Sequence, residues 1–367
     1  MSKLERLIQQ YCPDGVEYVR LGDILSVNRG KRLTKTQLSD DGKYYVYHGS
    51  KDTPLGRYSQ FNVKGNTTIV VNTGGIGGVK YCDDDFWCSD GSFWIGHSAL
   101  LNDKYVYYFL SPKESYFASQ KRVGGVPTID RSTVENVEIP VPPLPVQEEI
   151  VRILDTFTEL QAELQAELQK RQQQYNFYRD ILLSNMGNNA EYLTISEFAE
   201  LKAGKAIKAT ELSSIMDDNH SHPCFGGNGI RGFIGKVSHI GDYAIIGRQG
   251  ALCGCVNWAS GKFYATEHAV VCTPRPNVSS RYLYHLFTVA DLNQYKSQGA
   301  QPGLSVQRLN ELVFPIPPLE EQNRIVSILD RFDTLTNDLT SGLPAEMEKR
   351  RQQYEYYRDR LLTFKRL

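Results

Sequence analysis

The sequence predicts an α+β protein in which two similar β-rich globular domains are separated by a long antiparallel two-helix coiled coil. Three observations indicate this fold. The 367-residue chain contains two related halves. Within each half, short β-branched and aromatic runs alternate with glycine-rich turns, as is typical of strands. Each half then ends in a long segment with one apolar seam, which is typical of a coiled-coil helix.

The repeat is clearest at the end of each half. The stretch "IPVPPLPVQEEIVRILDTFTEL" from Ile139 matches "FPIPPLEEQNRIVSILDRFDTL" from Phe314 at a spacing of 175 residues. Further on, "KRQQQYNFYRDILL" from Lys170 matches "KRRQQYEYYRDRLL" from Lys349 at a spacing of 179, so the second copy carries extra residues near "TSGLPAEME". We therefore expect globular domains at 1–145 and 185–319, and long helices at 146–184 and 320–367.

A weaker similarity extends into the globular parts. "YVRLGDILSVNRGKRL" from Tyr18 resembles "YLTISEFAELKAGKAI" from Tyr192, and "VYHGS" resembles "CFGGN". "FWCSDGSFWI" from Phe86 resembles "FYATEHAVVC" from Phe263. One helix is expected before each proline-rich linker, at "DKYVYYFLSPK" and "SRYLYHLFTVADL", while the linkers "PVPPL" and "PIPPL" are expected to be stiff and non-helical. The two globular parts are thus predicted to share one scaffold.

The two terminal segments carry apolar residues at heptad spacing. In the first segment, Ile150, Phe157, Leu164 and Tyr178 form one series and Leu154, Leu168, Tyr175 and Leu182 another, while the second shows Ile325, Phe332 and Leu339. A single seam on each helix predicts a partner helix, and the other copy is the obvious one. The alternative is that each seam packs on its own globular domain. The second seam breaks near Gly342 and Pro344.

Composition limits the class of protein. The formal net charge is −1 with no charged tail, so a nucleic-acid surface would be a local patch. The N-terminal "MSKLERLIQQYC" lacks a signal-peptide core, and no run of about 18 apolar residues occurs, so we expect a cytoplasmic protein without membrane contact. The seven cysteines are expected to be reduced. Cys253, Cys255, His268 and Cys272 lack zinc-knuckle spacing, so we predict buried core residues and no metal.

Two divergent halves, each with P-x-P-P-L…Q…I-V-x-I-L-D and a helix closing on Q-Q-Y-x-x-Y-R-D-x-L-L, resemble the specificity subunit of type I restriction–modification systems. The resemblance covers nearly the whole chain. It implies that each globular half is a target-recognition domain reading one part of a split site in double-stranded DNA. It also implies that the helices separate these domains and dock two adenine-N6 methyltransferase subunits, and that motor-endonuclease subunits join the larger assembly.

The same resemblance implies that this chain performs no chemistry and binds no cofactor, with S-adenosylmethionine and ATP held by partner subunits. Sequence motifs agree. "GFIGKV" lacks the spacing and the Ser/Thr of a phosphate-binding loop. "VPPL" and "IPPL" lack the polar residue of an adenine-methyltransferase Asn-Pro-Pro element. The glycines Gly74, Gly75, Gly77 and Gly78 form no dinucleotide fingerprint, and tight turns explain them.

Basic and amide side chains in matching loops are the candidate DNA contacts. "NRGKRLTK" supplies Arg29, Lys31, Arg32 and Lys35, and the second copy supplies Lys202, Lys205 and Lys208. Three further loop pairs supply candidates. The first supplies Arg57 and Arg231, and the second supplies Arg248 and Gln249 from the second copy. The third supplies Lys121 and Arg122 in one copy and Lys296, Gln298 and Gln301 in the other. Lysine and arginine can neutralise phosphates, while Arg and Gln can also read base edges. The alternative for each is an ordinary solvated or structural loop residue.

Two other classes of function remain open. The first is a coiled-coil scaffold whose β-rich domains bind proteins or carbohydrates. It is less favoured because a basic loop occurs at equivalent places in both halves. The second is a self-contained restriction enzyme, which would require a methyltransferase or nuclease motif that the sequence lacks.

The tetrad Glu-Leu-Gln-Ala, repeated from Glu159 to Lys170, is predicted to act as a ruler. Each unit lengthens a helix by about 6 Å and turns it by about 400°. One base pair rises about 3.4 Å and turns roughly 34–36°, so a unit shifts the second domain by one or two base pairs with nearly the same facing. The resembling family includes members with tetrad repeats in this helix, where repeat number sets the half-site gap.

Inserting one more Glu-Leu-Gln-Ala after Ala166 should leave both half-site sequences intact and widen the unspecified gap between them. Methylation mapping of DNA from cells expressing the variant with its methyltransferase measures the gap. An unchanged gap would mean that these residues are present only because they are good helix formers.

Overall fold

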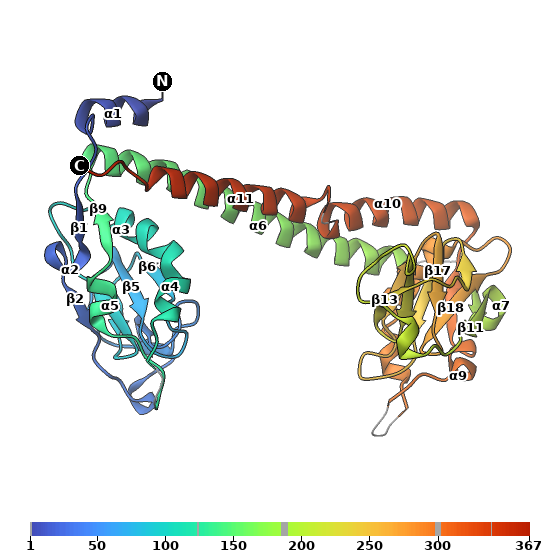
Figure 1. The fold of residues 1–367 in the computed structure, drawn as a ribbon. Coiled ribbons are helices and arrows are strands. Elements are labelled where there is room, and N and C mark those ends of the chain that lie inside the picture. Colours follow the sequence, from blue (N-terminus) through green and yellow to red (C-terminus); the bar gives the residue numbers. More distant parts are fainter. Residues whose placement is uncertain (1, 123–124, 185–189, 298–301, 339) are drawn as a thin grey trace. The chain divides into compact units, whose positions relative to one another are not determined.

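The computed structural model describes residues 2–122, 125–184, 190–297, 302–338 and 340–367 (Figure 1). The chain divides into two compact units. The first consists of residues 1–164 and 347–367, and the second of residues 165–346. Each unit contains a β-rich body and parts of the long helices. None of the helices in the described parts of the chain is long and apolar enough to cross a membrane.

The first body is built on two small sheets. The larger is antiparallel, with the order β2-β8-β5-β6. The smaller has the order β4-β3-β7, in which β3 and β7 are parallel, and a separate pair joins β1 to β9. The strands are β1 (Tyr18–Arg20), β2 (Val27–Arg29), β3 (Tyr44–Tyr47), β4 (Gly56–Tyr58), β5 (Thr67–Val71), β6 (Val79–Cys82), β7 (Trp87–Cys88), β8 (Ser92–Ile95) and β9 (Glu138–Pro140).

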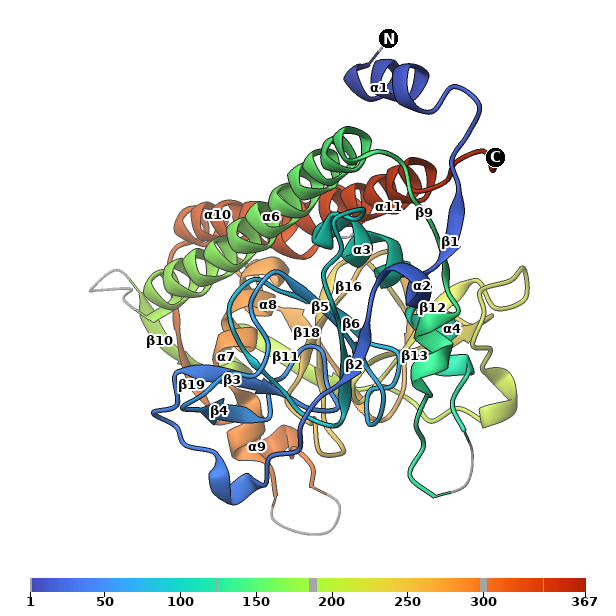
Figure 2. The same ribbon diagram turned by 90° about the vertical axis from the view of Figure 1, so that its left-hand side faces the viewer.

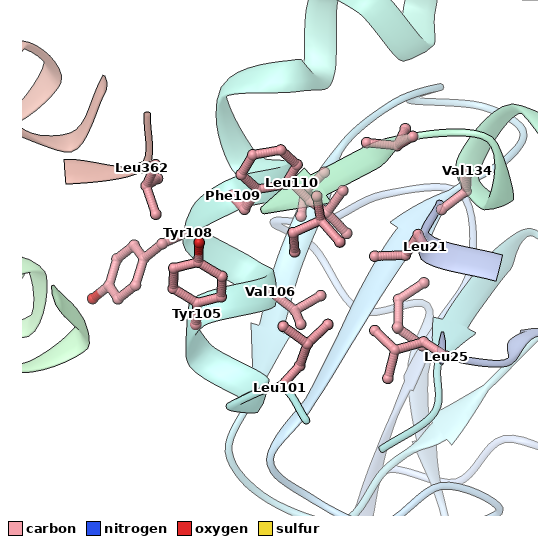
Figure 3. Packing of buried hydrophobic residues seen from close by; sticks show 14 of the residues in the cluster. Leu21, Leu25, Leu101, Tyr105, Val106, Tyr108, Phe109, Leu110, Val134 and Leu362 are labelled. Carbon is pink, nitrogen blue, oxygen red and sulfur yellow. The ribbon is translucent and has the colours of Figure 1, made fainter. Parts of the chain in front are cut away.

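Helix α3 (Asp103–Leu110) covers the central strand β5 and forms the core of this body (Figure 3). Asn102 caps the helix by accepting hydrogen bonds from the amides of Lys104 and Tyr105. Tyr105 and Leu110 are fully buried with Leu21, and the Tyr105 hydroxyl donates to the Pro140 carbonyl at 3.1 Å. The remaining helical elements are α1 (Lys3–Tyr11), α2 (Leu21–Ile24), η1 (Lys35–Gln37), η2 (Ser111–Lys113), α4 (Glu114–Ser119) and α5 (Arg131–Glu135).

The second body repeats this topology. Its larger sheet has the order β11-β18-β15-β16, its smaller sheet β13-β12-β17-β14, and β10 pairs with β19. The strands are β10 (Glu191–Thr194), β11 (Ala199–Ala203), β12 (His222–Gly226), β13 (Gly229–Ile234), β14 (His239–Ile240), β15 (Tyr243–Gly247), β16 (Val256–Ala259), β17 (Lys262–Ala265), β18 (Ala269–Pro274) and β19 (Val313–Ile316). The helical elements are α7 (Ile195–Phe198), η4 (Ala209–Glu211), α8 (Ser280–Val289), η5 (Leu292–Tyr295) and α9 (Val306–Asn310).

Strand registers confirm the weak similarity between the globular halves. Val71 of β5 lies opposite Ser92 of β8, and Gly247 of β15 lies opposite Ala269 of β18. Val46 pairs with Trp87 in parallel, as Cys224 pairs with Tyr264. These registers align "VNTGGIGG" with "GRQGALCG" and "FWCSDG" with "FYATEH" residue by residue.

The long helices follow the proline-rich linkers. Helix α6 spans Leu144–Ser184, and the division between the two units falls within it. The expected second long helix is instead two helices, α10 (Leu319–Asn337) and α11 (Leu343–Leu361). The prediction of a single helix over 320–367 is therefore wrong. The chain turns at Gly342, where an added Cβ would lie 2.5 Å from the Thr334 carbonyl oxygen.

Within each unit, part of α6 packs on another helix. In the first unit, the Phe157 ring stacks on Tyr357 with centroids 5.6 Å apart. In the second, Tyr178 stacks on Phe332 of α10 at 5.7 Å. The first residues of each seam behave differently, because Ile150 joins the core of the first body and Ile325 that of the second. Each seam thus begins on its own globular body and continues on a helix.

A glutamine fastens each long helix to its body, and both glutamines are fully buried. The Gln147 Oε1 accepts from the Asn102 amide at 2.8 Å, and its Nε2 donates to the carbonyls of Leu100 and Pro142 at 2.8 and 2.6 Å. The counterpart Gln322 accepts from the Ser279 amide at 2.8 Å. Its Nε2 donates to the carbonyls of Asn277 and Pro317 at 3.1 and 2.8 Å. The side-chain amide of each glutamine therefore forms hydrogen bonds with the cap residue of a helix, with a loop and with the linker.

A charged contact supports the same attachment. In the first unit Lys104 pairs with Asp155 at 3.0 Å, and Tyr108 donates to the same carboxylate at 2.6 Å. In the second, Arg281 pairs with Asp330 at 2.7 Å, and the fully buried His285 also lies 2.7 Å from this carboxylate. Burial lowers the pKa of His285, while the hydrogen bond to Asp330 opposes that shift.

Residues of the C-terminal segment complete the first unit (Figure 2). The Val16 amide donates to the Lys365 carbonyl at 2.9 Å, and the Leu367 amide donates to the Val16 carbonyl at 3.2 Å. The Tyr18 hydroxyl donates to the Phe364 carbonyl at 3.0 Å. Leu362 is buried in the core around α3. Two segments far apart in sequence are therefore needed to build this unit.

Replacing Gln147 by Leu should lower the free energy of unfolding by about 2–4 kcal/mol, because the Asn102 amide and two carbonyls lose their partners in a buried place. Urea unfolding of the full chain measures the change. Gln169→Leu is the matched control, since Gln169 is exposed on the same helix and should change stability by less than about 0.5 kcal/mol. Equal stabilities of the two variants would contradict the structural role of Gln147.

Candidate nucleic-acid interface

Five loops meet at one end of the first body. They lie at residues 29–32, 48–50, 72–75, 89–91 and the pair of segments 121–122 and 125–128, and together we call them the first loop edge. The Lys31 amide donates to the Cys88 carbonyl at 2.9 Å, and the Gly75 amide donates to the Gly49 carbonyl at 2.8 Å. Thr73 forms a bridge with Thr128. These backbone contacts hold the ends of β2, β3, β5 and β7 together.

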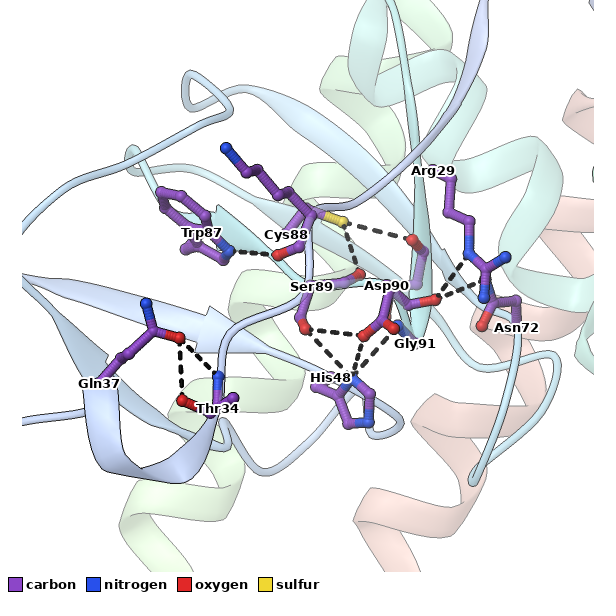
Figure 4. Close-up of polar contacts among 12 residues, drawn as sticks. Arg29, Thr34, Gln37, His48, Asn72, Trp87, Cys88, Ser89, Asp90 and Gly91 are labelled. Carbon is purple, nitrogen blue, oxygen red and sulfur yellow. Dashed lines mark hydrogen bonds and ion pairs between the residues drawn. The ribbon is translucent and has the colours of Figure 1, made fainter. Parts of the chain in front are cut away.

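Side chains at the first loop edge form a polar cluster around Asp90 (Figure 4). The Asp90 carbonyl accepts from Arg29 Nε and from Asn72 Nδ2, each at 3.2 Å. The Asp90 carboxylate lies 3.3 Å from His48 Nδ1, which is also 3.2 Å from the Ser89 hydroxyl. The cluster fixes the direction in which this carboxylate and imidazole point.

The second body gathers the equivalent loops, which we call the second loop edge: residues 203–206, 226–228, 248–251, 266–268 and 302–304. The Lys205 amide donates to the Ala265 carbonyl at 3.1 Å, and the Arg248 amide donates to the His268 carbonyl at 2.9 Å. Gln249 forms a bridge with Gly303. A hollow of about 520 Å³ lies here, lined by Gly227, Gln249, Gly250, Ala251, His268, Pro302 and Gly303.

The basic loops of both halves lie at these edges. Lys31 and Lys205 occupy equivalent places. Each follows a glycine after the end of β2 or β11, and each donates its backbone amide to the carbonyl of the last residue of β7 or β17. Both lysines are exposed, as are Arg32, Lys35 and Lys208. Lys202 is also exposed and lies on β11, one residue before the second loop edge begins. Burial and then the charge of Lys202 lower the pKa of His239 on β14.

Arg57 and Arg231, paired in the sequence comparison, do not occupy equivalent places. Arg57 lies on β4, where its guanidinium covers the Tyr45 ring at 4.4 Å and donates to the Tyr45 hydroxyl at 2.7 Å. Arg231 lies on β13 beside Gly226, whose added Cβ would lie 3.5 Å from the Arg231 Cβ. A register shift between Cys224 and Phe225 changes the pairing in the second body. Arg231 therefore adjoins the second loop edge, whereas Arg57 points along its own sheet.

The remaining candidates differ in their surroundings. Lys121 and Arg122 are exposed, and Arg122 forms an ion pair with Asp130. Gln249 is exposed in the hollow, while the half-buried Arg248 keeps its Nε without a partner among the described residues. Lys296 Nζ donates to Asn293 at 2.7 Å. Gln298 and Gln301 lie outside the described residues.

Sequence comparison missed the acidic and imidazole groups of these edges. Asp90 and Glu267 occupy the same aligned place, and each has a histidine beside it. His48 lies 3.3 Å from Asp90, and His268 Nε2 lies 3.2 Å from Glu267. The aligned acid in "FWCSDG" and "FYATEH" was a visible signal. The histidines were not, because they come from different loops.

All the cysteines except Cys255 are buried. Cys253 and Cys272 are fully buried, as expected, while Cys255 is partly exposed. Burial raises the pKa of the Cys255 thiol. Throughout the described ranges, no group of three or more His, Cys, Asp and Glu side chains could hold a metal ion. The loop edges thus offer cationic, amide and carboxylate groups for recognition.

Comparison with known proteins identifies the family. The model of the type I restriction modification DNA specificity domain matches residues 13–171 and again 188–349. The EcoprrI specificity subunit of Escherichia coli is 42% identical over 250 residues, covering 65% of this chain and 62% of that protein. The EcoR124I/EcoR124II specificity subunit of Escherichia coli is 30% identical over 414 residues, covering 99% of this chain and 97% of that protein.

A solved structure agrees with the fold. The S subunit of a type I restriction–modification system from M. genitalium superimposes with a TM-score of 0.69 at 18% identity, covering 95% of this chain and 97% of that chain. Two copies of one family model, placed on two bodies of one topology, together span most of the sequence. The chain therefore belongs to the family of type I restriction–modification DNA specificity subunits.

Proposed function

We propose that this chain is the non-catalytic DNA specificity subunit of a type I restriction–modification complex. Each globular body would read one half of a bipartite site in double-stranded DNA. The single observation that carries the proposal is that both bodies present equivalent loops with different polar side chains. Asn72 and Thr73 of one edge stand where Arg248 and Gln249 stand in the other. One scaffold with two sets of hydrogen-bonding groups suits the reading of two different sequences.

The charge distribution supports binding to DNA. Although the chain is nearly neutral, Lys31, Arg32 and Lys35 are exposed beside the first loop edge, and Lys205 and Lys208 beside the second. Phosphate contacts of this kind position a protein on the duplex without reading its sequence. The other proposed contacts are Arg29, Arg57, Lys121, Arg122, Lys202, Arg231, Arg248, Gln249, Lys296, Gln298 and Gln301.

We further propose that the long helices form an antiparallel coiled coil that sets the half-site spacing and docks two adenine-N6 methyltransferase subunits. Ring contacts of α6 with α11 and with α10 support the pairing. Exposed aromatic side chains support docking, since Phe177 is 60% and Tyr356 55% exposed. S-adenosylmethionine and ATP would be bound by the methyltransferase and by motor-endonuclease subunits, and the complex would act in the cytoplasm.

Co-expression with an adenine methyltransferase partner, followed by long-read methylation mapping, tests the function. A modified adenine in a two-part motif is the expected result. Absence of any modified motif, while the same partner is active with a known specificity subunit, would reject the function.

Replacing residues 18 to about 138 with the corresponding domain of another family member should change only one half of the methylated motif. The exchanged segment ends at the β1–β9 pairing, where Tyr18 lies opposite Pro140, so the linker and helix that follow stay unchanged. Motif mapping measures the outcome, and the parental protein under the same expression serves as the control. A change in both halves would contradict modular reading.

Replacing Lys31, Arg32 and Lys35 together by Gln should weaken binding to all duplexes and flatten the salt dependence. Each lost phosphate contact lowers the slope of log K against log salt by about 0.9, so three contacts would lower it by up to roughly 2.7. Binding isotherms of the methyltransferase complex at several salt concentrations measure the slope. Lys64→Gln, at the opposite end of β5, is the control. An unchanged slope in the triple variant would show that this loop does not touch phosphates.

A further inference from the structure

Each loop edge carries one histidine beside one carboxylate. In the first, His48 Nδ1 lies 3.3 Å from the Asp90 carboxylate, and the two side chains are 37% and 27% exposed. In the second, His268 Nε2 lies 3.2 Å from the Glu267 carboxylate, and these side chains are 34% and 41% exposed. Both pairs are partly open to solvent and flank the loops that carry the basic residues.

The two pairs occupy one place but are assembled differently. Strand registers put Asp90 and Glu267 at the same position, two residues after the end of β7 or β17. His48 follows β3 and faces Gly91, where an added Cβ would lie 2.6 Å from the imidazole Nδ1. In the second body the histidine and the glycine exchange positions: His268 stands where Gly91 stands in the first body, and Gly226 stands where His48 stands. The acid thus keeps its position in both bodies. Its histidine comes from the loop after β3 in the first body and from the acid's own loop in the second.

The pairs also leave hydrogen-bonding capacity unused. His48 Nε2 makes no hydrogen bond with any residue that the structure describes. Glu267 Oε2, His268 Nδ1 and the neighbouring Arg248 Nε are all buried atoms without a partner in the described parts of the second unit. A buried polar atom without a protein partner lowers stability, so in native proteins such atoms usually bond to water or to a ligand.

We propose that these pairs are specificity-determining residues that read base edges, each contacting an exocyclic amino group of cytosine or adenine. The inference rests on the proposed function. A carboxylate accepts a hydrogen bond from such an amino group but repels a phosphate, so a pair that includes an acid suits the groove floor rather than the backbone. The lysines beside it would hold the phosphates, and the imidazole would add a second hydrogen bond to the same base pair.

The test is methylation mapping of the full complex containing His48→Ala or His268→Ala. His48→Ala should relax one position of one half-site, with a loss of about 5- to 150-fold in discrimination between the preferred base and the others. His268→Ala should do the same in the other half-site only. Asp90→Asn and Glu267→Gln keep the shape but place a donor beside the acceptor, so each should weaken a preference for cytosine and favour adenine, whose N6 and N7 one amide can contact together.

Two other histidines are matched controls. His97 lies 2.9 Å from Asp103, and His220 lies 2.9 Å from Asp217, so each resembles the proposed pairs. His97 follows the opposite end of β8 from Gly91, and His220 precedes β12, away from the hollow. Alanine at either position should leave the motif unchanged.

The outcomes separate the two hypotheses. If the parental complex methylates a bipartite motif and all four pair variants return that motif with equal discrimination, the pairs do not read bases. Equal weakening on every sequence would assign them to phosphate contacts and would also overturn the inference. If the parental complex itself yields no motif with an active partner, the proposed function fails instead. Thermal unfolding of each variant, together with the conservative Asp90→Asn and Glu267→Gln, distinguishes a reading defect from misfolding.

Discussion

The buried amides of Gln147 and Gln322 determine how each body is joined to its helix. A proline-rich linker cannot donate enough backbone hydrogen bonds to fix its own path, since proline lacks the amide proton. The glutamine Nε2 donates to one carbonyl of the linker and to one carbonyl of a loop. Its Oε1 accepts a hydrogen bond from the backbone amide of the residue that caps α3 or α8. Because three chain segments share one side chain, the direction in which the helix leaves the body is fixed.

That attachment explains why the repeated motif is so similar in the two halves while the loops are not. Pro140, Gln147, Asp155 and their counterparts all serve one junction, where the carbonyl of Pro140, the amide of Gln147 and the carboxylate of Asp155 each have hydrogen-bond partners within the fold. Substituting any of them would leave a buried group without a partner. The loop edges carry no such constraint, because their outward side chains meet solvent or a ligand. Two recognition domains built on one fold require a junction that stays the same in both halves. They also require loop edges that differ between the halves.

The duplication, the strand-rich bodies and the linker positions could be predicted because they depend on periodicity and on proline chemistry, which are local properties of the sequence. The equivalence of Lys31 and Lys205 could also be predicted, since each follows a glycine in an aligned segment. The histidine beside Asp90 or Glu267 could not be found, because alignment places His48 opposite Gly226 and only the fold shows that His268 replaces it. The register shift beside Cys224 likewise hid the difference between Arg57 and Arg231. The break of the second seam near Gly342 and Pro344 indicated where α10 and α11 are separated, although one helix over 320–367 was predicted.

The composition of the first unit has a consequence for synthesis on the ribosome. The second unit is one continuous segment, 165–346, whereas the first needs residues 347–367 beside Val16 and Tyr18. Translation adds about 5–20 residues per second, so the first unit waits roughly 10–40 s for its last segment after residue 164 has been made. During that interval Phe157 lacks Tyr357, and the core around α3 lacks Leu362. The unit made first is therefore completed last, and nascent chains would expose its unfinished apolar surface to chaperones.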